Sequence, residues 1–242
     1  MVNVDTVYQR VLALANKEQR GYITPQEFNL FANQAQMDLF EQYFYDLNQF
    51  LRVPSNDTAY ANMVNILQEK IELFQKSNSY NTTAAATSYG AVSENTINLP
   101  SDYYRIAQVT TENYNGGIVE VEKVSKKQCD QAKTAPLTSP TLSRPQYYQL
   151  NSKIFINPTS IQSVNISYIH KPEKVNWTYV VVGGKALLNN NDANYQDFEL
   201  HPSEETDLVI KILQLAGLSL KDPGLIQVAA AEETKSIQQE KQ

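Results

Sequence analysis

The sequence is poor in the residues that build metal and redox sites. It has a single cysteine, Cys129, so it cannot form an internal disulfide, and it has no CxxC pair that could bind zinc. Its two histidines, His170 and His201, lie in separate segments, and neither belongs to an HExxH motif. We therefore predict that the chain has no metal site and no other cofactor, and that it assembles in a reducing, intracellular environment.

Long apolar runs and basic clusters are also lacking. The apolar runs extend over a few residues, far fewer than the ~20 that span a membrane. No cluster of basic residues is longer than Lys126-Lys127, and the net charge is −6. The first residues, MVNVDTVYQR, lack the basic segment and apolar core of a signal peptide. We expect no membrane contact and no tight binding to DNA, because such binding needs a basic face.

No motif predicts catalysis. The chain has no GxSxG elbow, although a Ser-His-Asp triad stays open because its members need not be neighbours in the sequence. Gly183-Gly184-Lys185 lacks the first Gly and the Ser or Thr of a phosphate loop, which favours a hairpin turn. Cys129 has no His partner nearby in the sequence, which favours an unreactive thiol. Glu204-Glu205 and Glu232-Glu233 fit helix termini and solvated faces. We predict no catalytic, cofactor-binding or metal-binding residue, and no enzymatic activity.

One segment imitates a calcium-binding loop. Residues 16–27 have the spacing of an EF-hand, with Gly21 at position six, Ile23 at position eight and Glu27 at position twelve. Position five, which needs an oxygen ligand, holds Arg20, and positions one and three hold Asn and Glu in place of the usual aspartates. A helix–turn–helix corner with a capping box explains the same residues. We therefore favour the corner over calcium binding.

The chain divides into three blocks, predicted as a helical region over 1–79, a β-rich domain over 80–200, and C-terminal helices with a tail over 201–242. The first helix buries a stripe from Val4 to Ala15 at three- and four-residue spacing. The second runs over residues 24–51, with Thr24 as N-cap and Pro25 at the first helical position, and should be ~40 Å long. The third begins at Asp57.

The middle block alternates β-branched or aromatic residues with polar ones. Turns are predicted at Asn115-Gly116-Gly117 and at Asn151-Ser152. The loop over 135–145, with three prolines, is a candidate contact element. The predicted strands, typical of a small sandwich or barrel, cover residues 85–89, 96–99, 104–111, 117–124, 146–150, 153–157 and 164–170.

The last block begins with a helix at Pro202, which carries Glu204 and Glu205 in its first turn. A second helix is expected from Pro223, and its polar end over 232–242 is either solvated or ordered by a neighbouring subunit. The predicted fold class is α+β. In it the N- and C-terminal helices form a bundle that carries an inserted small antiparallel β-sandwich or barrel.

Several stretches of the sequence resemble a family of phage proteins. They are NKEQRGYITPQEFNLFANQAQMDLFEQYFYDLNQ at 16–49, LPSDYYRIAQV at 99–109, RPQYYQLNSKIFINP at 144–158, ISYIHKP at 166–172, and FELHPSEETDLVIKILQLAGLSLK at 198–221. Together they look like the ring or adaptor proteins beneath the portal of crAss-like and related marine podoviruses. The middle block also resembles the tail tubular adaptor proteins of short-tailed phages.

This resemblance, which covers most of the chain, implies a structural protein of the virion. It would be assembled in the host cytoplasm and would form a ring, commonly of twelve copies, in the head-to-tail connector below the portal. Genome packaging and ejection would use the ring as a conduit, and an acidic lumen would let DNA slide. The expected partners are further copies of the chain in head-to-tail contact, the portal, neighbouring tail or ring proteins, and DNA passing without specific binding.

Within such a ring, the helices over 24–51 and 202–220 are expected to pack between neighbours. The loop over 135–145 and the tail over 232–242 are expected to reach the portal or the next ring. Two alternatives stay open, namely a virion-associated peptidoglycan hydrolase and a receptor-binding or decoration protein. The hydrolase predicts an acidic pair in a cleft, whereas the decoration protein predicts a monomer or trimer with an exposed aromatic patch.

Overall fold

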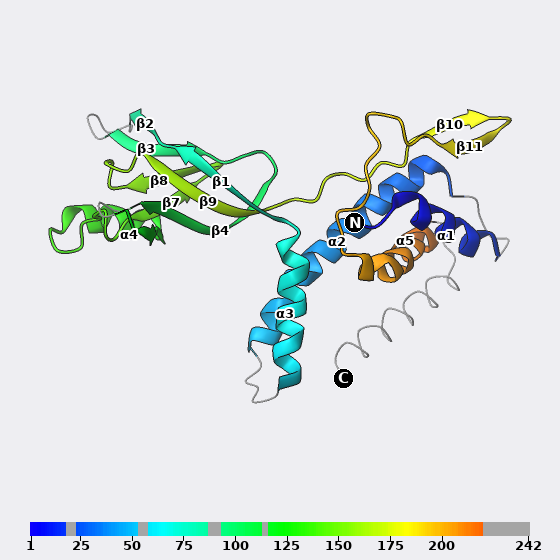
Figure 1. Cartoon of the computed structure of the whole chain (residues 1–242), viewed down its shortest axis with the longest axis horizontal. Helices are drawn as coiled ribbons and strands as arrows, with labels where there is room; N and C mark the ends of the chain where they lie inside the picture. Colours follow the sequence, from blue (N-terminus) through cyan, green and yellow to red (C-terminus); the bar gives the residue numbers. More distant parts are fainter. Residues whose placement is uncertain (18–22, 53–57, 87–92, 113–115, 220–242) are drawn as a thin grey trace. The chain divides into compact units, whose positions relative to one another are not determined.

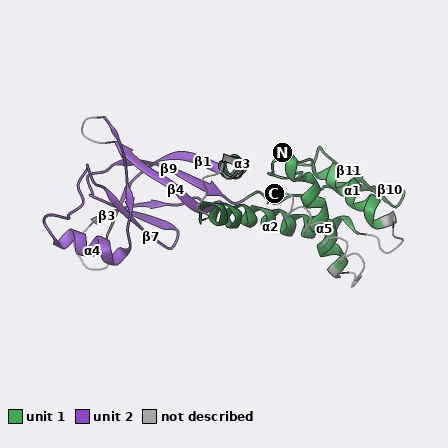
Figure 2. Ribbon diagram, turned by 90° about the horizontal axis from the view of Figure 1, so that it is seen from below, with its two compact units in different colours: residues 1–74, 172–242 green, residues 75–171 purple. Residues whose placement is uncertain are grey.

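The structure, a computed structural model, describes residues 1–17, 23–52, 58–86, 93–112 and 116–219. It has an α+β fold, as predicted, and separates into two compact units (Figures 1 and 2). The helical unit combines Met1–Phe74 with the chain from Pro172 onward, and the β unit comprises Gln75–Lys171. The β unit is therefore inserted into the sequence of the helical unit. The expected second C-terminal helix and the polar tail over 232–242 lie outside the described residues.

The helical unit follows the predicted helices closely. Its elements are α1 (Val4–Lys17), α2 (Pro25–Arg52), α3 (Thr58–Glu72), η1 (Pro202–Glu204) and α5 (Glu205–Ser219). The predicted capping box of α2 is confirmed, because the Glu27 amide donates to Thr24 Oγ1 at 3.3 Å and the Thr24 amide donates to Glu27 Oε2 at 3.0 Å. These bonds satisfy two amides that a helix start leaves free. The bonds that the Thr24 amide and hydroxyl donate to the Glu27 carboxylate lower the pKa of Glu27. Residues 18–22 of the EF-hand-like segment lie outside the described residues.

Apolar side chains from α1, α2, α5 and the segment 172–200 are buried in the helical unit. The face of α1 that was predicted from its spacing is buried, including Val4, Val7 and Val11. On α2 the buried positions run from Pro25 to Tyr43, whereas every side chain from Phe44 to Arg52 is half-buried or exposed. Among the described residues of this unit, the largest side chains that are fully buried are Trp177, Phe28, Phe40, Phe74, Phe198, Leu200, Leu208 and Ile212.

The boundaries of the β unit differ from the predicted 80–200. Its first strand begins at Gln75, and residues 172–200 belong to the helical unit. The reason is packing, because this segment buries Trp177, Phe198 and Leu200 and makes a β-bridge between Phe198 and Val2. Its only strands, β10 (Tyr179–Val182) and β11 (Lys185–Leu188), form a separate two-stranded sheet.

The β unit contains two sheets. The first has four antiparallel strands in the order β1 (Gln75–Asn81), β9 (Ser163–His170), β4 (Tyr103–Glu112), β5 (Ile118–Glu120). The second has five strands in the order β2 (Thr83–Ala86), β3 (Ser93–Asn98), β8 (Lys153–Asn157), β7 (Gln146–Leu150), β6 (Glu122–Lys123), of which only β6 and β7 are parallel. The helix α4 (Lys126–Thr134) begins with a capping box between Ser125 and Gln128.

Both sheets contribute to one hydrophobic core, in which Ile154 and Ile156 of β8 lie with Val164 and Ile166 of β9. The alternation of buried and exposed residues along β9 is the period of two expected for a strand with one solvated face.

The predicted β7–β8 hairpin is confirmed, and Asn151 in its turn adopts a left-handed φ of 55°. The single strand predicted over 117–124 is wrong, since it divides into β5 and β6 in different sheets. The hairpin turn predicted at Asn115 lies partly outside the described residues.

Candidate interaction site

Trp177 anchors the segment that leads from the β unit into the β10–β11 hairpin. Its indole is buried and lies 4.1 Å from the Tyr8 ring and 5.7 Å from the Tyr179 ring, centroid to centroid. Its Nε1 donates a hydrogen bond to Asp5 Oδ1 at 2.9 Å, so the polar edge is satisfied as well. Tyr179 is the first residue of β10, and Tyr8 belongs to α1. Trp177 packs between the two rings and therefore connects the base of the hairpin to α1.

A stripe of amide side chains on α2 holds the same segment through its backbone. Asn29, Asn33 and Gln36 lie four and three residues apart, which places them on one helix face. Their bonds are Asn29 Nδ2 to Trp177 O (3.2 Å), Trp177 N to Asn29 Oδ1 (2.9 Å), Asn33 Nδ2 to Val175 O (2.9 Å), Gln36 Nε2 to Glu173 O (2.8 Å) and Glu199 N to Gln36 Oε1 (3.2 Å). The stripe supplies partners to an extended backbone that has few of its own.

We expect Gln36→Ala to lower the free energy of unfolding of the helical unit by about 2 kcal/mol. Gln36 is buried and serves one carbonyl and one amide, and each unpaired buried polar group costs roughly 1–3 kcal/mol. Chemical denaturation followed by circular dichroism would measure the change. Gln34→Ala is the matched control, because Gln34 is exposed on the same helix and should cost less than about 0.5 kcal/mol. Equal effects of the two substitutions would contradict the assigned role.

The β10–β11 hairpin is closed by a tight two-residue turn. Val182 pairs with Lys185, and the intervening Gly183 and Gly184 have φ values of +59° and +77°. Two successive positive φ values are the signature of a type I′ turn, which matches the twist of the strands and favours glycine. The prediction that Gly183-Gly184-Lys185 forms a hairpin turn is therefore confirmed.

The hairpin exposes apolar side chains on both faces. Val180 pairs with Leu187 and Val182 with Lys185, so these four residues share one face, and Val181 lies on the other. The three valines and Leu187 are 46–67% exposed. Lys185 is the only charged residue between positions 179 and 188. A two-stranded hairpin is marginal in water by itself, so such a surface is suited to a protein partner.

The sheet edges of this hairpin are also open within the described part of the chain. The sheet contains β10 and β11 alone, so the outward-facing backbone N–H and C=O groups have no neighbouring strand. Native proteins protect such edges with charge, proline or a covering element, and this hairpin has a single lysine. The hairpin is therefore the strongest candidate for an interaction site among the described residues.

A network of polar groups connects α4 to the sheet in the β unit. Glu94 of β3 is buried, pairs with Lys133 of α4, and accepts a hydrogen bond from the Tyr148 hydroxyl at 2.6 Å. Burial alone would raise the pKa of Glu94, but the bonds from Lys133 and Tyr148 outweigh it and the net pKa is lowered. Burial and the neighbouring Glu94 carboxylate raise the pKa of Tyr148. The arrangement fastens α4 to the sheet.

Cys129 belongs to the same region and is fully buried on α4. Burial is the main reason that the pKa of its thiol is raised, and Asn157 Nδ2 donates to its Sγ at 3.2 Å. A buried thiol with a raised pKa is a poor nucleophile, because the thiolate is the reactive form. The structure thus supports the interpretation of Cys129 as an unreactive thiol.

We expect Glu94→Gln to destabilise the β unit by about 1–2 kcal/mol at pH 7, because glutamine keeps an acceptor for Tyr148 but loses the charge that Lys133 meets. The folded-state pKa of Glu94 lies below its unfolded value, so the stabilisation is complete above the unfolded pKa and disappears as pH falls through the folded pKa. Denaturation curves of both proteins from pH 7 to pH 3 should therefore converge at the acid end. Glu122→Gln is the control, since Glu122 is exposed on β6. A gap that stays constant down to pH 3 would contradict the assignment.

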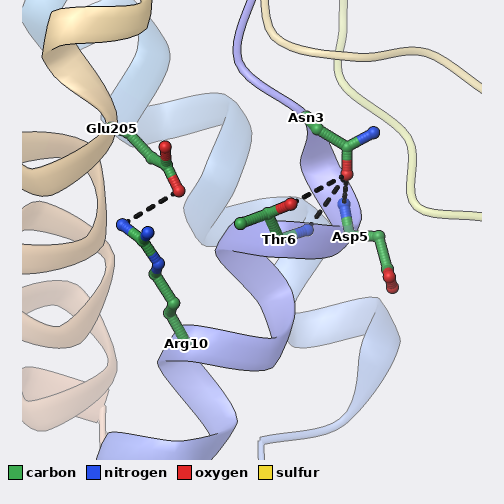
Figure 3. A network of polar contacts seen from close by, with 5 residues as sticks. All are labelled: Asn3, Asp5, Thr6, Arg10 and Glu205. Atoms are coloured by element: carbon green, nitrogen blue, oxygen red, sulfur yellow. Dashed lines mark hydrogen bonds and ion pairs between the residues drawn. The ribbon is translucent and has the colours of Figure 1, made fainter.

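The remaining candidate residues have structural partners. Glu204 pairs with Lys70 at 2.6 Å, and Glu205 pairs with Arg10 of α1 at 2.9 Å (Figure 3). Both glutamates lie where α5 begins, so the prediction that they occupy a helix terminus is confirmed. Figure 3 also shows Asn3, whose Oδ1 accepts from the amides at the start of α1.

The two histidines also have local roles. His201 Nδ1 accepts from the Ser203 amide at 3.3 Å and caps η1. His170 is buried at the end of β9, where its Nδ1 lies 2.8 Å from the carbonyl oxygen of Lys171. The described ranges contain no group of three His, Cys, Asp or Glu side chains that could hold a metal ion. None of the helices described is long and apolar enough to span a membrane.

Sequence reasoning did not identify the residues that build this interaction site. It recognised the glycine turn but not the exposed valines beside it, and it gave no role to Asn29, Asn33 and Gln36. A usable signal was present, because three amides at helical spacing on an otherwise apolar helix face indicate a polar partner inside the fold. The partner itself lies about 140 residues away in the chain and could not be inferred from spacing.

The chain matches no known protein family and no curated protein. The likeness to phage ring and adaptor proteins therefore stays a prediction drawn from the amino-acid sequence. The geometry of the hairpin and its anchor provides an independent basis for a functional proposal.

Proposed function

We propose that this protein is a structural subunit of a tailed phage particle. In this proposal it forms a ring of twelve copies in the head-to-tail connector below the portal, through which the genome is packaged and ejected. The observation that carries the proposal is the β10–β11 hairpin, which exposes apolar side chains on both faces and is held at its base by the stacking of Tyr179 on Trp177. A subunit that presents such an element is built to contact other protein chains.

The arrangement of the rest of the chain suits the same role. The finer fold that we propose is a helical bundle of α1, α2, α3 and α5 with an inserted β-sandwich formed by the two sheets of the β unit. In a connector, the bundle would pack between neighbouring copies and the β-sandwich would face another ring. The last turns of α2, from Phe44 to Arg52, contain no buried side chain, which supports the first of these assignments.

Charge and polar chemistry also favour a structural role. A net charge of −6 would keep a lumen from holding the phosphate backbone, so DNA could slide through it. Two buried carboxylates among the described residues, Glu94 and Glu204, are paired with lysines in the interior of the two units. Such pairs are suited to fastening elements together.

The mass of the purified protein tests the proposal. Mass photometry and negative-stain electron microscopy should find closed rings, alone or on addition of the portal protein from the same particle. A chain that stays monomeric under both conditions would refute the ring. Release of soluble fragments from purified cell wall would favour the hydrolase, and a trimer that ignores the portal would favour a decoration protein.

A further inference from the structure

The β unit has an open sheet edge along β1. In the first sheet β1 pairs with β9 alone, so the other side of the strand has no neighbour among the described residues. At seven residues, β1 is the longest edge strand of the described sheets. It contains no proline, and its one charged residue, Lys76, lies near its start and pairs with Asp102 at 3.1 Å. The devices that normally protect an edge strand are therefore absent from most of β1.

The backbone of β1 points its hydrogen-bonding groups alternately toward β9 and away from it. The Thr82 amide, one residue beyond the strand, donates to the Gln162 carbonyl at 2.8 Å, which continues the β1–β9 register by one pair. The backbone groups of Thr82 therefore face β9, and so do those of the even-numbered residues of β1. The groups that point away from β9 form a continuous row, which we call the β1 edge, on Gln75, Ser77, Ser79 and Asn81.

The β10–β11 hairpin has the same kind of row on β10. The Asn189 amide donates to the Thr178 carbonyl at 2.9 Å, which continues the register of the hairpin by one pair. By the same alternation, the backbone groups of Tyr179 and Val181 point away from β11. All three valines of β10 are exposed, whereas exposed and half-buried residues alternate along β11. The more accessible edge of the hairpin is therefore that of β10.

Antiparallel pairing of β10 with the β1 edge would determine which side chains meet. Residues directly opposite each other share a sheet face, so Val181 would lie beside the exposed serines of β1. Val180 and Val182 would lie on the other face, where Tyr80 packs against the hydrophobic core of the β unit. Because Tyr80 is only partly buried, the two valines would extend this core at its open side.

Net charge favours a contact between the helical unit of one copy and the β unit of another. Residues 75–171 contain nine Lys or Arg and six Asp or Glu, which gives the β unit a net charge of +3. The whole chain has −6, so the helical unit carries −9. A contact between two hairpins would bring two acidic units together, whereas a contact between the hairpin and the β1 edge joins units of opposite charge.

The other edge strands of the β unit are less suitable acceptors. Both β5 and β6 are shorter than β1 and carry a glutamate, Glu120 and Glu122 respectively, and β2 has only four residues. Within one described subunit, β1 and β10 do not pair with each other. The length, charge and open backbone of β1 therefore indicate a strand from a second copy as its partner.

We propose that β10 of one copy adds to the β1 edge of the next copy as an antiparallel strand. Main-chain hydrogen bonds hold the added strand, and Val180 and Val182 lie against Tyr80. The donor and acceptor surfaces differ, so the contact is heterologous and propagates head to tail until a ring closes. This inference rests on the proposed function and specifies which elements join neighbouring copies.

Proline substitutions on β1 test this pairing. Ser77→Pro with Ser79→Pro removes two amides that point away from β9, so the β1–β9 bonds remain and the subunit should fold. The concentration needed for assembly should rise about 100-fold or more, because the edge loses two donors to the added strand. The matched control is Ser77→Val with Ser79→Val, which keeps both amides and should keep the ring. Mass photometry measures assembly, and circular dichroism verifies folding.

Two results of this test would overturn the pairing. One is a proline variant that forms rings at wild-type concentrations. The other is loss of the ring in the valine control as well, because assembly would then depend on the side chains of this face and not on the backbone edge.

A mixing experiment shows whether the two edges meet between copies. The donor variant, Val180→Glu with Val182→Glu, keeps the β1 edge, and the proline variant keeps the hairpin. Each variant alone should be monomeric. An equimolar mixture should form dimers that grow no further, because one intact β10 meets one intact β1 edge. Mass photometry distinguishes monomer, dimer and ring.

The outcomes separate this inference from the proposed function. If the wild type forms rings and the mixture stays monomeric, the pairing is wrong although the ring stands. If the wild type forms open chains and the mixture forms dimers, the pairing stands and the ring is refuted.

A crosslink gives a further test should the proline variant not fold. One chain carries Val181→Cys and a second, co-expressed chain carries Ser79→Cys, and the assembly is treated with a short bis-maleimide. Cys129 is buried and should not react. A crosslink between the two chains is expected, and its absence would overturn the contact.

Discussion

Replacing Val180 and Val182 by glutamate should turn the assembled protein into monomers without unfolding it. Each valine is close to half-exposed or more in the isolated subunit, and burying such a side chain at an interface contributes about 1.5–3 kcal/mol. Glutamate would lose this contribution and would also carry an unpaired charge into an apolar contact, which adds a desolvation cost. A combined loss of about 3 kcal/mol or more corresponds to at least a 100-fold weaker association.

The fold should survive these substitutions for a local reason. The glycine turn and the stacking of Tyr179 on Trp177 hold the hairpin in place. Neither feature involves the side chains of Val180 and Val182. The thermal transition of the variant should therefore stay within a few degrees of that of the wild-type subunit. Circular dichroism would verify this, and mass photometry over a range of concentrations would measure the association.

Two controls make this result specific. Ile118→Glu places the same charge on an exposed apolar residue of β5 in the β unit, and it should leave the ring intact. Val182→Thr keeps the branched shape of valine and replaces one methyl group by a hydroxyl, so its effect should fall between wild type and the double variant. Rings that persist in the double variant at wild-type concentrations would show that the hairpin is not an assembly element.

The parts of the fold that the sequence predicted well are those with local causes. The capping box of Thr24 and Glu27, the stripe on α1 and the start of α5 all depend on residues within a few positions of one another. The turn of the β7–β8 hairpin is equally local, because Asn151 tolerates the left-handed backbone that the turn needs. Periodicity and capping rules act at this range, so they succeed for these elements.

The parts that failed depend on contacts between distant residues. The segment 172–200 has few periodic apolar residues, and its place in the helical unit is decided by Trp177 and by the amides of α2. The parallel pairing of β6 with β7 divides what the sequence suggests is one strand. Glu94 meets Lys133 and Tyr148 across 39 and 54 residues. No spacing rule connects residues that are so far apart.

The same distinction applies to the candidate interaction site. Two consecutive glycines, Gly183 and Gly184, are enough to predict a turn. Exposure of the neighbouring valines, in contrast, depends on which surfaces the rest of the chain covers. A run of three valines is ordinarily interpreted as a buried strand. Only the tertiary structure shows that β10 and β11 form a sheet of their own. For this reason the valines are interpreted as a contact surface and not as part of a core.

Trp177→Ala should destabilise the helical unit by about 3–5 kcal/mol, more than is expected for Gln36→Ala in the same unit. The indole is buried against Tyr8 and Tyr179 and donates to Asp5, so truncation leaves a large cavity and an unpaired carboxylate. Trp177→Phe keeps a ring but loses the Nε1 donor, and about 1–2 kcal/mol is expected from that bond to a charged acceptor. The difference between the two variants separates packing from hydrogen bonding.

This measurement needs a subunit that does not assemble, because association adds to apparent stability. The Val180→Glu, Val182→Glu background provides one. Unfolding is followed by circular dichroism, since Trp177 is the only tryptophan and its fluorescence is lost in both variants. Tyr45→Ala, at an exposed aromatic of the same unit, should change the free energy of unfolding by less than about 0.5 kcal/mol. If Trp177→Ala cost no more than this control, the indole would not anchor the hairpin. The support that the assembly proposal draws from this anchor would then be lost.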